Sequence, residues 1–320
     1  MFAVTAAAAD PHDPLAGLRL GDHPAPEPPP GWEVVTVRAA ALNHHDLWTL
    51  RGVGIDPARL PVVLGCDAAG VTATGREVVV HAVVSDPDGR DETLTGDFSI
   101  LSERYDGTFA EQVAVPARNL VDKPAALTFE EAACLPVAWL TAYRMLFTRA
   151  ELRPGQRVLI QGAGGGVATA ALLLARGAGL HVTVTSRDED KLERARQLGA
   201  HVTLASGQRL PARVDAVVET VGEATWEHSL KALEPGGTVV VSGATSGPNP
   251  PADLARVFFR QLRVVGSTMG TRQELVDLVR MLEATGIRPP IDDTFPLSEA
   301  PRAFRQMLEG ELFGKLVLRP

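Results

Sequence analysis

A group of glycines, at positions 162 and 164–166, is the feature that most restricts how this chain can fold. Residues 157–161 (RVLIQ) before them are typical of a buried β-strand, and residues 167–175 (VATAALLLA) after them favour a helix. A strand, a glycine turn and a helix in this order form a phosphate-binding unit, because the free N–H groups of the helix N-terminus point at the loop. The uncharged run 158–175 has the length of a membrane span, but its central glycines favour the strand–turn–helix interpretation.

Two alignments of this loop with a dinucleotide-binding fingerprint can be drawn. Gly162-x-Gly164 leaves Val167 where a third small residue is needed. Ala163-x-Gly165-x-x-Ala168 has small residues at all three points, with Gly165 where the backbone must approach the pyrophosphate. We prefer the second alignment, although a glycine turn that serves packing alone is the alternative. The residues expected at the cofactor are Ala163, Gly164, Gly165, Gly166 and Val167.

From residue 157 onward, short β-branched runs alternate with segments of helical length. This alternation is typical of a doubly wound parallel sheet, the Rossmann architecture, and predicts an α/β fold class. One helix is expected at residues 188–198, where Leu192, Ala195 and Leu198 share a face. The strands are expected at residues 157–161, 181–186, 201–204, 215–220, 237–243 and 263–267.

The first 120 residues follow a different pattern, with Val-rich runs at 33–41, 70–84 and 108–115 that Pro, Gly and Asp interrupt. Almost no helical periodicity occurs there, so we expect an irregular β domain. The chain has 320 residues, enough for about two domains. After a helix expected at about residues 271–285, a strand-like segment at 314–319 closes the chain and could rejoin the first domain.

The residues after the second predicted strand distinguish NAD from NADP. NAD sites usually place Asp or Glu there on the ribose hydroxyls, and NADP sites place Arg there on the 2′-phosphate. Here Ser186 and Arg187 are followed one turn later by Lys191, a combination that can bind a phosphate. We therefore expect NADP(H), although Asp188 would offer a carboxylate to NAD if the register shifted by one residue.

Charge and cysteine content exclude several classes of function. The net charge is −8 and Lys and Arg do not cluster, so neither nucleic acid nor a membrane surface is an expected partner. Two cysteines, Cys66 and Cys134, are too few for a disulfide framework or a four-Cys zinc site, which fits a reducing compartment. Residues 1–9 lack the basic start of a signal peptide, and we expect a soluble cytoplasmic protein.

Six segments, spread over nearly the whole chain, carry a resemblance to a known protein family. They are AALNHHDLW (40–48), LGCDAAGV (64–71), DGTFAEQVAVPARNLV (106–121), LTFEEAACLPVAWLTAYRML (127–146), PGQRVLIQGAGGGVATAA (154–171) and GKLVL (314–318). Together they resemble the medium-chain dehydrogenase/reductase superfamily, which includes zinc alcohol dehydrogenases and zinc-free quinone oxidoreductases. The resemblance implies a GroES-like catalytic domain at residues 1–124, a Rossmann domain at 125–286, and a C-terminal return to the first domain at 287–320.

The chain departs from the zinc-binding pattern of that superfamily. Zinc members carry the catalytic metal on Cys, His and Cys or Glu, where this chain has Asn43, Cys66 and Val137. Catalytic zinc needs three protein ligands, and one remains. Residues 81–104 also contain no cysteine, where most zinc members have a four-Cys structural lobe. We therefore expect no metal, either structural or catalytic.

Without zinc, other groups must stabilise the negative charge that hydride transfer leaves on a substrate oxygen, and must supply a proton. The catalytic candidates are Asn43 and His45, because the resemblance places His45 where many zinc enzymes have a proton-relay Ser or Thr. His45 could instead contact the backbone or the cofactor, and Asn43 could only position other groups. Asp46 is expected to hold its loop, and Asp67 to be a residue behind the lost metal or a partner of a histidine.

Further contacts follow from the resemblance alone. It implies a homodimer, in which the edge strands of the two Rossmann sheets pair. It also implies cofactor contacts around the nicotinamide from Thr141, Val221, Gly243, Ser267, Thr268, Met269, Gly270 and Lys315.

The function expected from all of this is NADPH-dependent, zinc-independent reduction of a small quinone, enone or carbonyl compound. Two alternatives stay open: an NADPH-binding sensor or interaction protein without turnover, and an enoyl reductase of one pathway with a bulky substrate.

Overall fold

The structure, a computed structural model, describes residues 1–85 and 91–320. The chain forms two compact units: Met1–Leu140 together with Gly270–Pro320, and Thr141–Met269. The second unit is shorter at both ends than the Rossmann domain expected at 125–286. The reason is that the helices on either side of it, at Phe129–Ala133 and Arg272–Thr285, pack against strands of the first unit.

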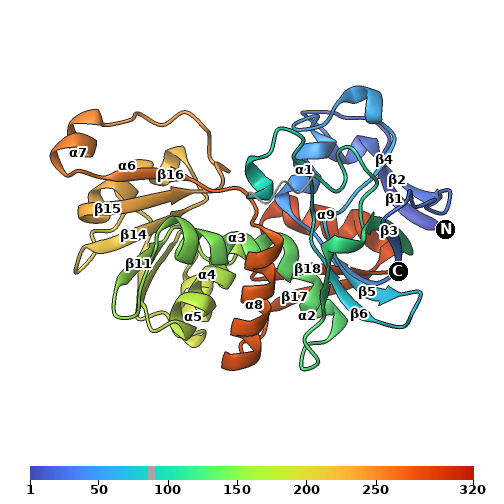
Figure 1. Cartoon of the computed structure of the whole chain (residues 1–320). Helices are drawn as coiled ribbons and strands as arrows, with labels where there is room; N and C mark the ends of the chain where they lie inside the picture. Colours follow the sequence, from blue (N-terminus) through green and yellow to red (C-terminus); the bar gives the residue numbers. More distant parts are fainter. Residues whose placement is uncertain (86–90) are drawn as a thin grey trace. The chain divides into compact units, whose positions relative to one another are not determined.

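The first unit consists mainly of short strands (Figure 1). Among the described residues it also has four α-helices. Its helices are α1 (His44–Leu50), α2 (Phe129–Ala133), α8 (Arg272–Thr285) and α9 (Ala300–Glu309). Its strands are β1 (Phe2–Ala6), β2 (Leu18–Asp22), β3 (Trp32–Ala41), β4 (Val62–Val63), β5 (Asp67–Thr72), β6 (Glu77–Val80), β7 (Val83–Val84), β8 (Ser99–Ile100), β9 (Gln112–Pro116), β10 (Leu120–Asp122), β17 (Ile291–Pro296) and β18 (Lys315–Arg319).

The main sheet of this unit has the order β10-β6-β5-β3-β18-β17, with β9 also paired to β3. The C-terminal strand β18 runs antiparallel to β3, with Val317 opposite Ala41. The C-terminal segment therefore returns to the first unit, as expected. On the other side of β3, β5 is also antiparallel, with Asp67 opposite Ala41. The C-terminal end of β3 and the N-terminal ends of β5 and β18 thus lie side by side.

An apolar core holds this unit together. Helix α9 buries Ala300, Ala303, Phe304 and Met307, whose i, i+3, i+4, i+7 spacing forms one helix face. Phe304 packs edge-to-face on Phe109, with ring centroids 6.2 Å apart.

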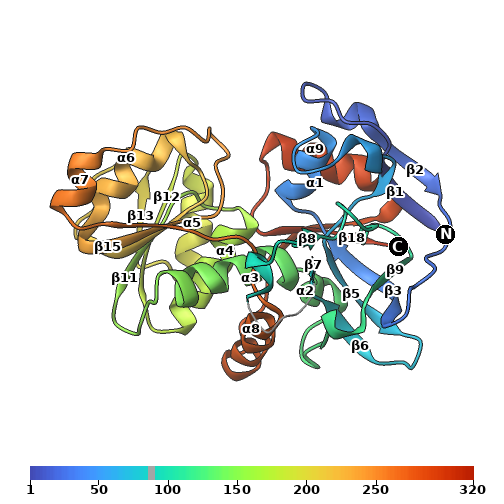
Figure 2. The same cartoon turned by 45° about the horizontal axis from the view of Figure 1, so that its top comes forward.

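The second unit is a six-stranded parallel sheet with the order β13-β12-β11-β14-β15-β16. Figure 1 and Figure 2 show helices on both of its faces. The strands are β11 (Arg157–Ile160), β12 (His181–Ser186), β13 (Val202–Ala205), β14 (Val214–Glu219), β15 (Leu233–Val241) and β16 (Arg263–Gly266), and the helices are α3 (Leu140–Tyr143), α4 (Gly166–Gly177), α5 (Glu189–Gln197), α6 (Glu223–Ala232) and α7 (Leu254–Phe259).

All six predicted strands and the predicted Rossmann architecture are confirmed. The largest difference is at β15, which begins at Leu233 because that residue pairs with Val214 before an irregularity in the ladder. Strand order reverses between β11 and β14, and ligands of doubly wound sheets bind at the carboxyl ends of the strands at such a point.

The uncharged run 158–175 forms most of β11, the glycine loop and part of the 12-residue α4. Within the described part of the chain, no helix is both long enough and apolar enough to cross a membrane.

Candidate active site

The glycine loop joins β11 to α4 and has the geometry of a phosphate-binding turn. Gly162 and Gly164 adopt φ angles of 78° and 96°, which side chains other than glycine rarely tolerate. Gly165 is the N-cap of α4, and no side chain caps the helix. A Cβ placed on Gly165 would meet no atom within 4 Å. A free helix N-terminus and open space at Gly165 are features that a pyrophosphate-binding loop requires, and the choice between the two registers stays a prediction.

The end of β12 presents a hydroxyl and positive charge. Ser186 Oγ accepts a hydrogen bond from the Asp188 amide at 3.1 Å, and Arg187 is exposed. Asp188 Oδ1 accepts from the amides of Asp190 and Lys191, at 2.9 and 3.2 Å, and thereby caps α5. The Asp188 carboxylate therefore already has a structural role, which favours the phosphate-binding interpretation of Ser186, Arg187 and Lys191.

A buried carboxylate organises the end of β14, and the sequence analysis missed it. Glu219 is fully buried, and its Oε1 accepts from the amides of Val221 and Gly222 at 2.8 and 3.0 Å. The hydroxyls of Thr225 and Ser229 also donate to this carboxylate, at 2.9 and 2.6 Å. The backbone at Val221, an expected cofactor contact, is thus held by Glu219. A Glu at the end of the apolar strand DAVVE was the available signal.

The same network continues from β14 to the ends of β11 and β12. Gln161 Nε2 donates to Ser229 Oγ at 2.9 Å, and Thr185 Oγ1 donates to Gln161 Oε1 at 2.6 Å. These contacts tie the ends of β11, β12 and β14 together beside the glycine loop.

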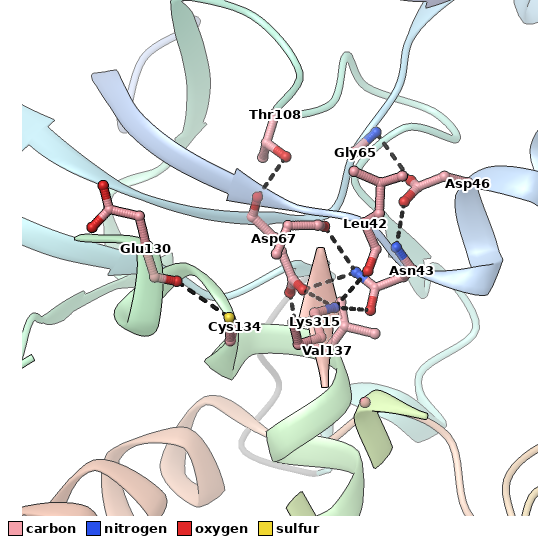
Figure 3. Close-up of polar contacts among 12 residues, drawn as sticks. Leu42, Asn43, Asp46, Gly65, Asp67, Thr108, Glu130, Cys134, Val137 and Lys315 are labelled. Carbon is pink, nitrogen blue, oxygen red and sulfur yellow. Dashed lines mark hydrogen bonds and ion pairs between the residues drawn. The ribbon is translucent and has the colours of Figure 1, made fainter. Parts of the chain in front are cut away.

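In the first unit, three polar side chains meet where β3 ends and its two neighbours, β5 and β18, begin. Figure 3 shows Asn43, Asp67 and Lys315 pointing toward one another. Lys315 Nζ donates to Leu42 O at 2.6 Å, to Asn43 Oδ1 at 2.6 Å and to Asp67 Oδ2 at 3.0 Å. A lysine ammonium has three N–H donors, so these three acceptors use all of them. The resemblance assigns Lys315 to the cofactor, but the structure directs its ammonium at Asp67.

Asp67 collects further donors. Asn43 Nδ2 donates to its Oδ2, and the Val137 amide donates to its Oδ1, both at 2.8 Å. Burial raises the pKa of Asp67, while the Lys315 charge and the hydrogen bonds from Asn43, Lys315 and the Val137 amide oppose that shift. Of the residues aligned with zinc ligands, Asn43 and Val137 therefore contact Asp67.

The third aligned residue, Cys66, bonds to a different part of the first unit. Its Sγ donates to Leu101 O at 3.1 Å, and burial raises the pKa of the thiol. Among the described residues, no group of three or more His, Cys, Asp or Glu side chains is placed to hold a metal ion.

Asp46 holds the turn into α1. Its Oδ2 accepts from the Asn43 amide at 2.8 Å, and its Oδ1 accepts from the Gly65 amide at 3.2 Å. Burial raises the pKa of Asp46 to about 7. The structural role expected for this residue agrees with these bonds.

His45 lies in the first turn of α1, and its Nε2 is buried without a hydrogen-bond partner among the residues that the structure describes. Glu103 Oε1 lies 3.9 Å from this nitrogen. Burial lowers the pKa of His45, and the Glu103 charge acts in the opposite direction. Within the described ranges 1–85 and 91–320, no protein group hydrogen-bonds this imidazole nitrogen.

The other expected cofactor residues divide between the two units. Thr141, Val221, Gly243, Ser267, Thr268 and Met269 belong to the second unit, whereas Gly270 belongs to the first. Ser267 Oγ is buried and has no hydrogen-bond partner in the described part of the chain, and Gly270 O accepts from His81 Nε2 at 2.9 Å.

Comparison with known proteins agrees with this architecture. Residues 29–125 match the family model "Alcohol dehydrogenase GroES-like domain", and residues 166–284 match "Zinc-binding dehydrogenase". The chain is 33% identical to a zinc-type alcohol dehydrogenase-like protein of Schizosaccharomyces pombe, over 96% of this chain and 97% of the relative.

Two solved structures show the same fold. The crystal structure of an NAD-dependent alcohol dehydrogenase has a TM-score of 0.92 at 36% identity, covering 100% of both chains. A 2-octenoyl-CoA carboxylase reductase in complex with NADP and 2-octenoyl-CoA has a TM-score of 0.89 at 25% identity, covering 99% of this chain and 87% of the other. With both its domains and its full length matched, this chain belongs to the medium-chain dehydrogenase/reductase superfamily.

Proposed function

We propose that this protein is an NADP(H)-dependent, zinc-independent reductase of a small quinone, enone or carbonyl compound. Among these substrates, a C=C bond conjugated to a carbonyl has the strongest support, because the reductase complex at 25% identity holds an enoyl thioester. The observation that carries the proposal is the buried ion pair of Lys315 with Asp67, whose carboxylate contacts two of the residues that the resemblance aligns with zinc ligands.

The Lys315 ammonium supplies the cation that Asp67 requires. Both side chains are almost completely buried, and a buried carboxylate without a countercharge would be strongly destabilised. A metal ion at this place would have to displace the ammonium, and the residues aligned with its ligands include an amide and a valine. The chain thus has a countercharge of its own beside the residues that align with zinc ligands.

The residues of the chain then have distinct roles in the reaction. Bound NADPH supplies the hydride. Negative charge develops on the substrate oxygen, and His45 Nε2 is the unpartnered donor that can stabilise it and deliver a proton. Asn43 uses its side-chain oxygen on Lys315 and its nitrogen on Asp67, so we assign it to positioning these groups.

The preference for NADP(H) over NAD(H) rests on the end of β12. Ser186, Arg187 and Lys191 offer a hydroxyl and two cations, while the nearby Asp188 carboxylate caps α5. The solved structures include both an NAD-dependent enzyme and an NADP complex, so the charge at this strand end supports the choice.

A turnover assay tests the proposal. NADPH oxidation is followed with a panel of quinones, enals, enoyl thioesters and ketones, with NADH in parallel. We expect turnover with at least one member, fastest among substrates with a conjugated C=C bond. Tight NADPH binding with no turnover on any member would instead favour a cofactor-binding sensor.

We also propose a homodimer formed through the edge strand β16. Val264 on this strand is 50% exposed, and Phe258 and Phe259 on the preceding helix α7 are 62% and 78% exposed. An exposed strand edge beside large apolar side chains is a typical interaction surface. Light scattering coupled to size exclusion should give twice the chain mass of 34.0 kDa, and a monomer at micromolar concentration would reject this assignment.

A further inference from the structure

The relation between His45 and Glu103 leads beyond the proposed hydride transfer. The 3.9 Å between His45 Nε2 and Glu103 Oε1 is too long for a direct hydrogen bond. One oxygen atom at about 2.8 Å from each of the two atoms fits this separation, so a water molecule can connect them.

The Glu103 carboxylate is oriented through its other oxygen. Oε2 accepts from the Ile100 amide at 2.9 Å and from Ser99 Oγ at 3.2 Å. Both donors belong to β8, so the strand fixes the carboxylate and leaves Oε1 on the side of His45.

Glu103 also faces a pocket of the first unit. The pocket has a volume of about 320 Å³ and is lined by Gly54, Asp56, Arg59, Phe98, Ser99, Glu103 and Arg104. Four of these side chains are charged, so the pocket is suited to hold water. Glu103 therefore contacts the pocket on one side and approaches His45 on the other.

We propose that Glu103 returns a proton to His45 after each turnover, as a positioning residue that connects the water of this pocket with the imidazole. The inference rests on the proposed function, because a reductase consumes one proton for each NADPH that it oxidises.

The proton balance of the cycle is complete. The hydride from NADPH and the proton from the His45 imidazolium reduce the substrate, which leaves NADP⁺ and a neutral imidazole with a lone pair on Nε2. The Glu103 carboxylate takes a proton from a hydronium ion of the pocket water and passes it on through the bridging water, so that an N–H bond forms at Nε2. Glu103 is then again the carboxylate that balances the charge of the imidazolium.

The charges around the two histidines of α1 favour Glu103 for this role. Burial lowers the pKa of His45, and Glu103 is the charged group that acts against it. Lys315 and Arg51 act on His44, whose pKa they lower together with burial. The protonated form of His45 thus depends on Glu103.

Glu103→Gln tests the relay, with Glu77→Gln as the control. Glu77 is a carboxylate of the same unit, paired with Lys123 at 3.1 Å. We expect Glu103→Gln to lower kcat by about 10-fold or more. As the pH rises, the activity of Glu103→Gln should begin to fall at a lower pH than the activity of the wild type. The reason is that the His45 imidazolium has lost its countercharge. Glu103→Asp should recover part of the loss, and Glu77→Gln should match the wild type.

Two further measurements separate a relay from a structural role. Added acetate should restore part of the activity of Glu103→Ala, whereas chloride at the same ionic strength should not. NMR titration of the His45 imidazole should give a lower pKa in Glu103→Gln than in the wild type. An unchanged pH profile, or an unchanged His45 pKa, in folded Glu103→Gln would overturn the inference. Absence of wild-type turnover on the whole panel would instead reject the proposed function itself.

Discussion

Lys315 and Asp67 form an ion pair that is almost completely removed from solvent, with Nζ 3.0 Å from Oδ2 and side-chain exposures of 3% and 0%. The two residues are the first residues of β18 and β5, the strands that flank β3 on either side. The pair lies beside Asn43 and Val137, two of the residues that the resemblance aligns with zinc ligands.

Lys315→Met should destabilise the protein by about 3–5 kcal/mol, because it leaves the Asp67 carboxylate buried without a countercharge. Urea unfolding measures this loss. Arg76→Met is the control: its ion pair with Asp122 is exposed, and its removal should cost less than about 1 kcal/mol. Equal losses in the two variants would contradict the role of the buried pair.

Asp46 should make the stability of the protein depend on pH. Burial raises its pKa from the ordinary value of 3.8 to about 7. In this range the folded state binds more protons than the unfolded state, so stability falls as the pH rises from about 4 to about 7. Between these pH values, the free energy of unfolding of Asp46→Asn should fall by up to about 4 kcal/mol less than that of the wild type. Urea unfolding at pH 4.5 and 7.5 compares the variants, and parallel losses in both would disagree with this account.

Arg187→Ala should raise the Kd of NADPH by roughly 10-fold or more, since a charge-assisted contact with the 2′-phosphate is lost. The Kd of NADH should change little. Arg196→Ala is the matched control on α5, because this exposed arginine pairs with Glu189 and Glu193. Fluorescence titration gives the six affinities, for the wild type and both variants with each cofactor. If the wild type binds NADH as tightly as NADPH, the assignment of the cofactor is wrong.

Glu219→Gln should weaken NADPH binding and destabilise the second unit by about 1–3 kcal/mol, because the amide leaves buried donors without acceptors. The affected donors include the amides of Val221 and Gly222. Glu234→Gln, an exposed position on β15, serves as the control. Calorimetry with and without NADPH separates the two effects, and an unchanged Kd in Glu219→Gln would limit Glu219 to a structural role.

Local patterns in the sequence were sufficient for much of the fold. β-Branched runs and the glycine loop predicted all six strands of the second unit. The hydroxyl–arginine pair Ser186–Arg187 could be recognised because it stands at the end of a predicted strand. His45 and Asn43 could be selected because the resemblance aligns them with a proton-relay residue and with a zinc ligand, and they lie before and within α1.

Contacts between distant segments could not be predicted in the same way. Lys315 and Asp67 are 248 positions apart and meet through the sheet order β5-β3-β18. Glu103 reaches His45 because β8 orients its carboxylate, and nothing in the sequence near Glu103 indicates that direction. The unit boundaries differ from those expected because α2 and α8 pack on strands of the first unit.

The most direct test of the central claim is the zinc content of the purified protein measured together with its NADPH turnover, before and after dialysis against a chelator. With Lys315 as the built-in cation, we predict well below one zinc per chain and the same turnover before and after dialysis. One zinc per chain, with turnover that is lost on its removal and restored on its return, would contradict the account.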